Sequence, residues 1–113
     1  MNKFSIGEFD EVVMLTGAVL YENAYGISIK EEIERRLERK VSVGAMRTAL
    51  SRLEKKGFLE SEFGEATAVR GGKRKRYFKV TPLGKKVLEQ VMETRKQLWE
   101  SIPSVAFDFK YKP

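Results

Sequence analysis

The sequence contains neither cysteine nor histidine, and it has only three prolines in 113 residues. The lack of cysteine excludes a disulfide framework, a thiolate metal site and a thiol nucleophile. The lack of histidine removes the commonest general acid–base group near neutral pH and the commonest metal ligand. No glycine-rich phosphate loop follows a strand pattern, and no pair of carboxylates clearly converges. We therefore predict that the protein is not an enzyme and binds neither a metal nor a cofactor.

Long apolar runs are also absent. No stretch approaches the roughly 18 to 20 consecutive apolar residues of a membrane span, and the first residues lack the apolar segment of a signal peptide. We therefore expect a cytoplasmic protein with no membrane partner. With 42% hydrophobic and 11% aromatic residues, the composition is typical of one folded domain with a modest core.

Basic residues outnumber acidic ones. The chain has 22 lysines and arginines against 16 aspartates and glutamates, a formal net charge of +6. Such a balance favours an anionic partner, either nucleic acid or an acidic membrane surface. The positions of the charges along the chain distinguish a nucleic-acid partner from a membrane surface.

Apolar spacing predicts three helices in the first part of the chain. Ser5 and Glu8 have the spacing of a capping box that begins the first helix, and this helix stops near Glu22. Ser42 is the expected N-cap of the third helix and Gly57 its C′ residue. A second, highly charged helix between them is marked by apolar residues four apart: Ile29, Ile33 and Leu37.

The period of the pattern then changes. Apolar and polar residues alternate over 59–63 and 76–80, which predicts two strands of an antiparallel ribbon with a long hairpin tip. Thr81 and Pro82 have the residue types expected at the start of a fourth helix, which Pro103 ends. Aromatic residues at alternate positions of the tail predict either an extended arm on another subunit or a disordered end.

This order of elements defines the expected fold class. Three helices, a two-stranded wing and a long helix make a mainly α protein with a small β wing, the winged helix-turn-helix plan. We expect residues 1–80 to form the DNA-binding domain. Residues 81–113 would form a C-terminal dimerisation helix and tail, within one compact unit.

The hairpin tip concentrates positive charge around a pair of glycines. Such closely spaced positive charges repel one another unless a bound polyanion neutralises them. Its lysines and arginines can grip phosphates across the DNA backbone, and an arginine can enter the minor groove. A solvated loop is the alternative. The candidate DNA contacts in this wing are Arg70, Gly71, Gly72, Lys73, Arg74, Lys75 and Arg76.

One face of the third helix is small, polar and basic. It contains no carboxylate, and Glu54 lies at its margin. An α-helix fits the major groove of DNA, where Arg47 could make a bidentate pair with a guanine. An ordinary solvent-facing surface, the alternative, usually mixes acidic with basic residues. The candidate contacts on this helix are Gly44, Arg47, Thr48, Ser51 and Lys55.

The fourth helix carries an apolar seam interrupted by Arg95. Packing on a second copy of the chain is the interpretation that we favour, because helix-turn-helix dimers read two half-sites of double-stranded DNA. Packing on the first helix of the same chain is the alternative. The candidate residues of the homodimer interface are Leu88, Val91, Arg95, Leu98, Trp99 and Ile102.

Three phrases of the sequence resemble the PadR family of bacterial and archaeal regulators: AYGISIKEEIERR (24–36), VSVGAMRTALSRLEKKGFLES (41–61) and GGKRKRYFKVTPLGKKVL (71–88). The resemblance covers most of residues 6 to 90 and implies a dimeric winged-helix repressor. Carried over by position, it assigns Ser42, Gly44 and Thr48 to the recognition helix and Gly71, Gly72, Lys75 and Tyr77 to the wing.

The resemblance has one departure and one further implication. The tyrosine common in the recognition helix of the family is replaced here by Arg47, so the operator that is read should differ. Some relatives bind aromatic small molecules between the C-terminal helices. Trp99 is accordingly the candidate contact for a small aromatic effector.

Other function classes fit the residues less well. A winged-helix protein–protein interaction module would not need so basic a wing, and a non-specific nucleic-acid-binding protein would not need a recognition helix. RNA is disfavoured because the major groove of an RNA duplex is too deep and narrow for a helix to read. Membrane binding would require a basic amphipathic helix, whereas the densest basic segment lies in a hairpin.

Overall fold

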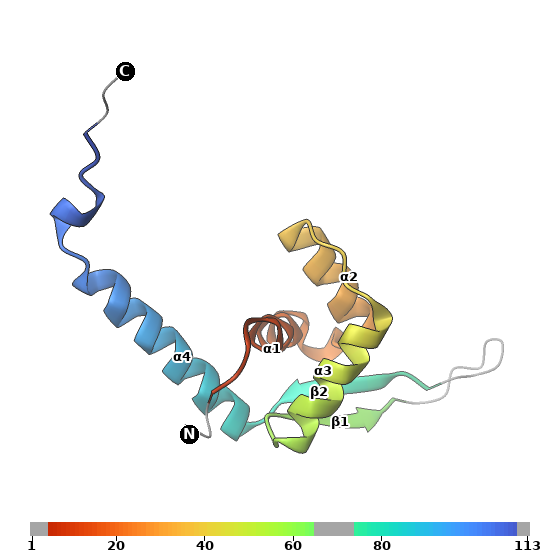
Figure 1. Cartoon of the computed structure of the whole chain (residues 1–113). Coiled ribbons are helices and arrows are strands. Elements are labelled where there is room, and N and C mark those ends of the chain that lie inside the picture. Colours follow the sequence, from red (N-terminus) through yellow and green to blue (C-terminus); the bar gives the residue numbers. More distant parts are fainter. Residues whose placement is uncertain (1–4, 65–73, 111–113) are drawn as a thin grey trace.

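The computed structural model describes residues 5–64 and 74–110. The elements occur in the predicted order (Figure 1). They are α1 (Glu8–Leu20), the 3₁₀ turn η1 (Tyr21–Asn23), α2 (Gly26–Leu37), α3 (Val43–Lys55), β1 (Leu59–Phe63), β2 (Arg76–Val80), α4 (Pro82–Ser101) and the 3₁₀ turn η3 (Ser104–Phe107). A mainly α fold with a small two-stranded wing is therefore confirmed.

The hydrophobic core lies where α1, α2 and α3 meet the wing and the first turns of α4. The apolar spacing of each helix turns one stripe inward, and burying each large side chain stabilises the fold by about 1.5–3 kcal/mol. The largest fully buried side chains are Met14, Ile29, Ile33, Leu53, Val13 and Val87. In Figure 1, α1 lies between α4 on one side and the α2–α3 pair on the other.

Two of the three predicted N-caps are confirmed, and so is Gly57, which follows the C-cap of α3 with a φ of 80°. The Ser42 hydroxyl accepts the Ala45 N–H at 3.0 Å, and the Thr81 hydroxyl accepts the Gly84 N–H at 3.0 Å. The capping box at Ser5 is wrong: Gly7 is the N-cap of α1, and no side chain caps this helix. Because the helix begins only at Glu8, that carboxylate cannot reach back to a cap.

The wing is fastened to the helices through the segment before α2. The two strands pair antiparallel, from Leu59 opposite Val80 to Phe63 opposite Arg76. On the other edge of β2, the carbonyl oxygen of buried Ala24 accepts the Phe78 N–H at 2.8 Å. This hydrogen bond fixes the position of the wing relative to the start of α2.

Gly84 lets the first turn of α4 approach the end of α3 and the start of β1 closely. A Cβ atom at this position would lie 2.2 Å from the carbonyl oxygen of Phe58 and 2.9 Å from the Cγ1 atom of Val80. Val87 and Leu88 follow on the same side and join the core. The T-x-x-G pattern thus combines a cap at Thr81 with a close approach at Gly84.

The outer part of α4 leaves the body (Figure 1). The described part of the tail does not form the predicted extended arm or disordered end, because Ser104–Phe107 turn as a 3₁₀ helix. This turn brings the ring of Phe107 to 6.2 Å from that of Trp99 and to 6.3 Å from that of Phe109, between centroids. Aromatic contact with Trp99 accounts for the turn. Tyr111 lies outside the described residues.

Candidate nucleic-acid interface

The predicted two-faced character of α3 is confirmed. Its buried side consists of Met46, Ala49, Leu50 and Leu53. Its exposed side presents Arg47, Thr48, Ser51 and Lys55. Among the residues that the structure describes, neither Arg47 nor Lys55 has an ion-pair partner. Their positive charges are therefore available to an anion from outside.

The first turn of α3 is small. A Cβ atom at Gly44 would meet only the Ser42 hydroxyl, at 4.0 Å, so the packing of the chain does not require glycine there. The absence of a side chain leaves the backbone open to close approach by a partner. Ser42 itself is engaged as the cap of the helix, which makes its hydroxyl a structural acceptor.

An ion pair with a buried carboxylate and a partly exposed arginine joins α3 to α1. Arg52 donates from Nε and Nη2 to the two carboxylate oxygens of Asp10, at 2.7 and 2.6 Å, and the Asp10 side chain is only 6% exposed. The hydrogen bonds to Asp10 raise the pKa of Arg52 above its ordinary value. This bidentate pair gives the contact between α3 and α1 a specific geometry. Asp10 was not among the predicted residues.

We call the start of β2 and the two residues before it the base of the wing, because the hairpin tip begins there. It presents two exposed cations, Arg74 and Lys75. The Lys75 ammonium lies 4.3 Å from the centroid of the Tyr25 ring and 3.3 Å from its hydroxyl oxygen. The Tyr77 ring packs edge-on against the same Tyr25 ring, with centroids 5.6 Å apart. Tyr77 thus supports Tyr25, and Tyr25 holds Lys75 at the root of the wing.

Arg76 has a different environment from its neighbours. Its Nη2 atom donates to Glu54 Oε1 at 2.6 Å and its Nε atom to the Ser61 hydroxyl at 2.9 Å. Ser61 in turn donates to Glu54 Oε2 at 2.6 Å. This network of Glu54, Ser61 and Arg76 ties both strands to α3. Arg76, predicted as a DNA contact, therefore already has a carboxylate partner within the chain.

Four predicted wing residues, Arg70, Gly71, Gly72 and Lys73, lie outside the described residues. Within the described part, a shallow groove separates α3 from the base of the wing, with Arg47 and Ser51 on one wall and Lys75 and Arg76 on the other. A second hollow continues along α3 past Thr48 to Lys55. The two basic surfaces predicted from the sequence thus adjoin each other.

The residues predicted for a dimer interface divide into three groups. Leu88 is buried in the core of its own chain, and the Arg95 guanidinium donates to Glu11 Oε2 at 2.9 Å. Val91 and Ile102 are half-buried. Leu98 and Trp99, by contrast, are 66% and 70% exposed. Of the residues predicted for the interface, the two apolar ones that remain exposed therefore lie at the outer end of α4.

A helix-turn-helix with a basic exposed face on its second helix, next to a basic β ribbon, defines a winged-helix DNA-binding protein. The transcriptional regulator PadR-like family matches residues 17–90 of the sequence. The chain belongs to this family, as the resemblance of its sequence phrases indicates.

Individual relatives agree with this assignment. An uncharacterised protein of Lysinibacillus sphaericus is 30% identical over 98 residues, which cover 85% of each chain. The structure of a PadR-like transcription factor from Bacteroides fragilis superimposes with a TM-score of 0.68 at 26% identity, covering 82% of this chain and 84% of that one. A PadR family transcriptional regulator from Eggerthella lenta gives a TM-score of 0.64 at 25% identity, covering 85% and 81%.

The family fixes the class of activity, which is DNA-binding transcriptional regulation and not enzymatic catalysis. No helix in the two described ranges is long and apolar enough to cross a membrane.

Proposed function

We propose that the chain is a homodimeric repressor that reads a palindromic operator with α3 and grips the DNA backbone with its wing. One observation carries the proposal. The exposed face of α3, with Arg47 and Lys55, adjoins Lys75 and Arg76 across a shallow groove. The carboxylate that lines this groove, Glu54, is paired with Arg76. A duplex laid against this surface meets base-reading and phosphate-binding side chains together.

Arg47 has the central role in reading sequence. It lies one turn into α3, where recognition helices reach base edges, and its guanidinium matches the N7 and O6 acceptors of guanine. Thr48 and Ser51 lie beside it on the exposed face and can bond either bases or phosphates. Lys55 is at the far end of the helix and suits a phosphate. Gly44 lets the first turn enter the groove closely.

The wing supplies affinity without sequence preference. Arg74 and Lys75 are exposed at its base, and Lys75 is held there by Tyr25. Each cation that neutralises a phosphate releases counterions from the DNA, which makes binding dependent on salt. The assignments of Arg70, Gly71, Gly72 and Lys73 to the same role rest on the sequence alone.

The dimer is supported by the apolar surface at the outer end of α4. Trp99, Phe107 and Phe109 are 70%, 55% and 70% exposed, and the Phe107 ring lies 6.2 Å from that of Trp99 and 6.3 Å from that of Phe109. Contiguous exposed apolar side chains of this kind mark an interaction surface. A two-fold pairing through them would present the two α3 helices to successive major grooves, about 34–36 Å apart.

Release by a small aromatic effector is the finer part of the proposal. The Trp99 ring is exposed and lies 6.2 Å from the Phe107 ring, tilted by 37°, so a planar ligand can pack against its open face. Trp99 is the single tryptophan of the chain. Its fluorescence therefore reports on this position alone. Titration with a panel of small aromatic compounds should identify one that quenches it saturably and weakens DNA binding, and a signal that stays flat with every compound would remove the effector.

The test of DNA reading is fluorescence anisotropy with a duplex from upstream of the gene and a scrambled duplex, across a salt series. Wild-type protein should bind the upstream duplex at least a hundredfold more tightly than the scrambled one. Arg47→Ala should reduce this ratio at least tenfold, because one base contact is lost from each half-site. Lys86→Ala removes the same charge from an exposed position on α4 and should preserve the ratio.

Two other results would change the proposal. If wild-type protein binds both duplexes alike and both complexes weaken steeply with salt, the chain binds nucleic acid without sequence preference. If neither duplex binds, the winged helix is a protein interaction module. Sedimentation at micromolar concentration tests the dimer separately, and a monomer would refute it. A reporter gene behind the operator tests repression, because deleting the regulator should raise expression.

A further inference from the structure

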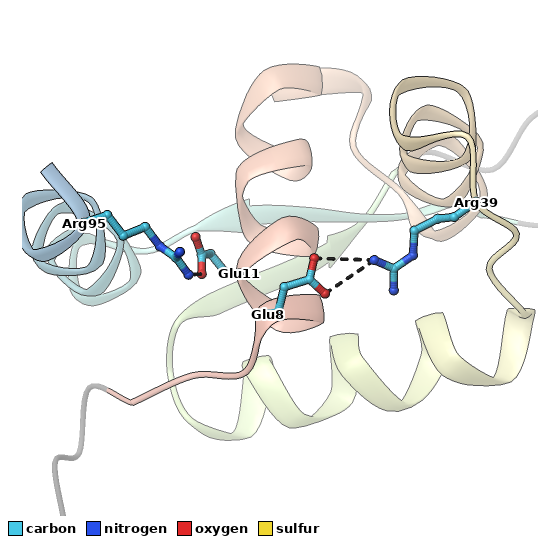
Figure 2. Close-up of polar contacts among 4 residues, drawn as sticks. All are labelled: Glu8, Glu11, Arg39 and Arg95. Atoms are coloured by element: carbon cyan, nitrogen blue, oxygen red, sulfur yellow. Dashed lines mark hydrogen bonds and ion pairs between the residues drawn. The ribbon is translucent and has the colours of Figure 1, made fainter. Parts of the chain in front are cut away.

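The first turn of α1 carries three carboxylates, and each pairs with an arginine from a different part of the chain. The pairs are Glu8 with Arg39, Asp10 with Arg52, and Glu11 with Arg95. Figure 2 shows the first and third of them, on opposite sides of α1. This helix therefore contacts the segment after α2, the recognition helix and α4 through charged side chains.

The three pairs differ in strength. Glu8 and Arg39 are 64% and 42% exposed with their nearest atoms 3.4 Å apart, so solvent screens their attraction. In the other two pairs the arginines Arg52 and Arg95 are similarly exposed, at 43% and 60%, but the side chains of Asp10 and Glu11 are only 6% and 9% exposed. A carboxylate buried to this degree is strongly disfavoured without its cation, which makes these two contacts specific in position.

Asp10 and Glu11 are neighbours in sequence but hold different helices. Asp10 fixes Arg52 of α3, and Glu11 fixes Arg95 of α4. Both carboxylates belong to one turn of α1. The orientation of α4 relative to the recognition helix is therefore set through α1.

The Glu11–Arg95 pair is the outermost polar contact between α4 and the body. Beyond Arg95, no described residue of α4 makes an ion pair or a side-chain hydrogen bond to another element. Leu98 and Trp99, which follow, are exposed. The arginine that interrupts the apolar seam therefore holds α4 just before its free end.

We infer that Glu11 and Arg95 are positioning residues that set the angle between α4 and α3, and through it the half-site spacing that the dimer accepts. The inference rests on the proposed dimer and operator. At about 1.5 Å per residue, the helix from Leu88 to Ser101 is about 20 Å long. A tilt of about 10° at Leu88 thus moves its outer end by about 3.4 Å, the rise of one base pair.

The angle can be measured without DNA. The chain has no cysteine, so Glu31→Cys on α2 and Glu100→Cys on α4 give one pair of spin labels per chain. Pulsed electron paramagnetic resonance measures the distance between the two labels, and labelled chain is diluted into unlabelled chain so that only distances within one chain contribute. The wild-type background should give a single narrow distance distribution. Arg95→Gln should broaden or shift it. Lys96→Gln, which removes an exposed charge from the same turn, should not.

A second variant keeps the test valid if Arg95→Gln folds poorly. Glu11→Gln retains a hydrogen-bond acceptor for Arg95 and removes the buried charge, and it should broaden the distribution less than Arg95→Gln. Thermal melts establish that each variant is folded before labelling. Distributions that coincide for wild type, Arg95→Gln and Glu11→Gln would overturn the inference.

The consequence for DNA is measured with operators whose half-sites are moved apart or together by one base pair. Wild-type protein should lose affinity several-fold for each altered spacing, whereas Arg95→Gln should discriminate less among the spacings. If wild type binds no duplex specifically, the proposed function is wrong. The label distances still test whether Glu11 and Arg95 set the angle of α4. If wild type binds specifically and Arg95→Gln keeps the same spacing preference, the inference alone is wrong.

Discussion

Gly84 is the position at which one added methyl group should most disturb the docking of α4. The Cβ atom of an alanine there would lie 2.2 Å from the carbonyl oxygen of Phe58 and 2.9 Å from Val80 Cγ1. The carbonyl oxygen cannot simply move away, because it accepts the Thr81 N–H at 3.1 Å. Either this hydrogen bond or the position of the first turn of α4 has to change.

The expected cost follows from three contributions. Overpacking of this kind costs about 1–3 kcal/mol, and loss of the Thr81 hydrogen bond costs about 1 kcal/mol. The better helix propensity of alanine offsets up to about 1 kcal/mol. Gly84→Ala should therefore lower the free energy of unfolding by about 1–3 kcal/mol, which in a domain of this size lowers Tm by roughly 5–20 °C.

Thermal and urea unfolding, followed by circular dichroism, measure this change. Gly17→Ala is the matched control: its Cβ atom would meet only Ile29 Cδ1, at an ordinary 3.9 Å. That substitution gains helix propensity without a clash and should raise the stability by up to about 1 kcal/mol. A Gly84→Ala variant that unfolds at the wild-type temperature would show that α4 docks differently.

Three further predictions concern the site and its support. Arg74→Gln should lower the slope of log K against log salt for DNA binding by about 0.9, the loss of one phosphate contact. Arg76→Gln should weaken binding at every salt concentration without changing this slope, because the Arg76 guanidinium pairs with Glu54 and not with a phosphate. If both variants lower the slope equally, Arg76 contacts the DNA. The pKa of Glu34 lies below its ordinary value of 4.5, mainly because its carboxylate accepts the Val41 N–H at 2.9 Å and secondly because it accepts a hydrogen bond from Lys30. A lowered carboxylate pKa contributes stability that is present above the ordinary value and lost as the pH falls through the lowered one. In melts below pH 4.5, wild type should therefore lose more stability than Glu34→Gln, and parallel losses would contradict this. Finally, Gly44→Leu should leave Tm near that of wild type, since nothing crowds this position, but should abolish specific DNA binding; a large fall in Tm would mean that the fold, not the DNA, requires glycine there.

Features that depend on neighbouring residues could be predicted from the sequence. The strands at 59–63 and 76–80 have the predicted bounds, because alternation along five residues is a local signal. Ser42 and Thr81 cap their helices as predicted, since a cap needs only the residue and the next turn. The Ser5 capping box failed because the same pattern also fits a helix that begins two residues later.

Contacts between distant residues could not be predicted in this way. Glu11 and Arg95 are 84 positions apart, and Asp10 and Arg52 are 42 apart. The only trace of the first pair in the sequence is a cation where an apolar residue would fit. Arg76 shares its segment with other basic residues, so nothing local separates it from the exposed cations. Only the fold, which brings Glu54 and Ser61 to its guanidinium, makes that distinction.

The central claim is that α3 enters the major groove with Arg47 on a guanine, and guanine N7 methylation interference tests it most directly. N7 lies in the major groove, so a methyl group there should block wild-type binding at positions in two half-sites, about 10–10.5 base pairs apart. Arg47→Ala should lose sensitivity at one guanine of each half-site and keep the rest. Binding that is indifferent to N7 methylation, or blocked only by methylation of adenine N3 in the minor groove, would contradict the assignment of α3 as the reading element.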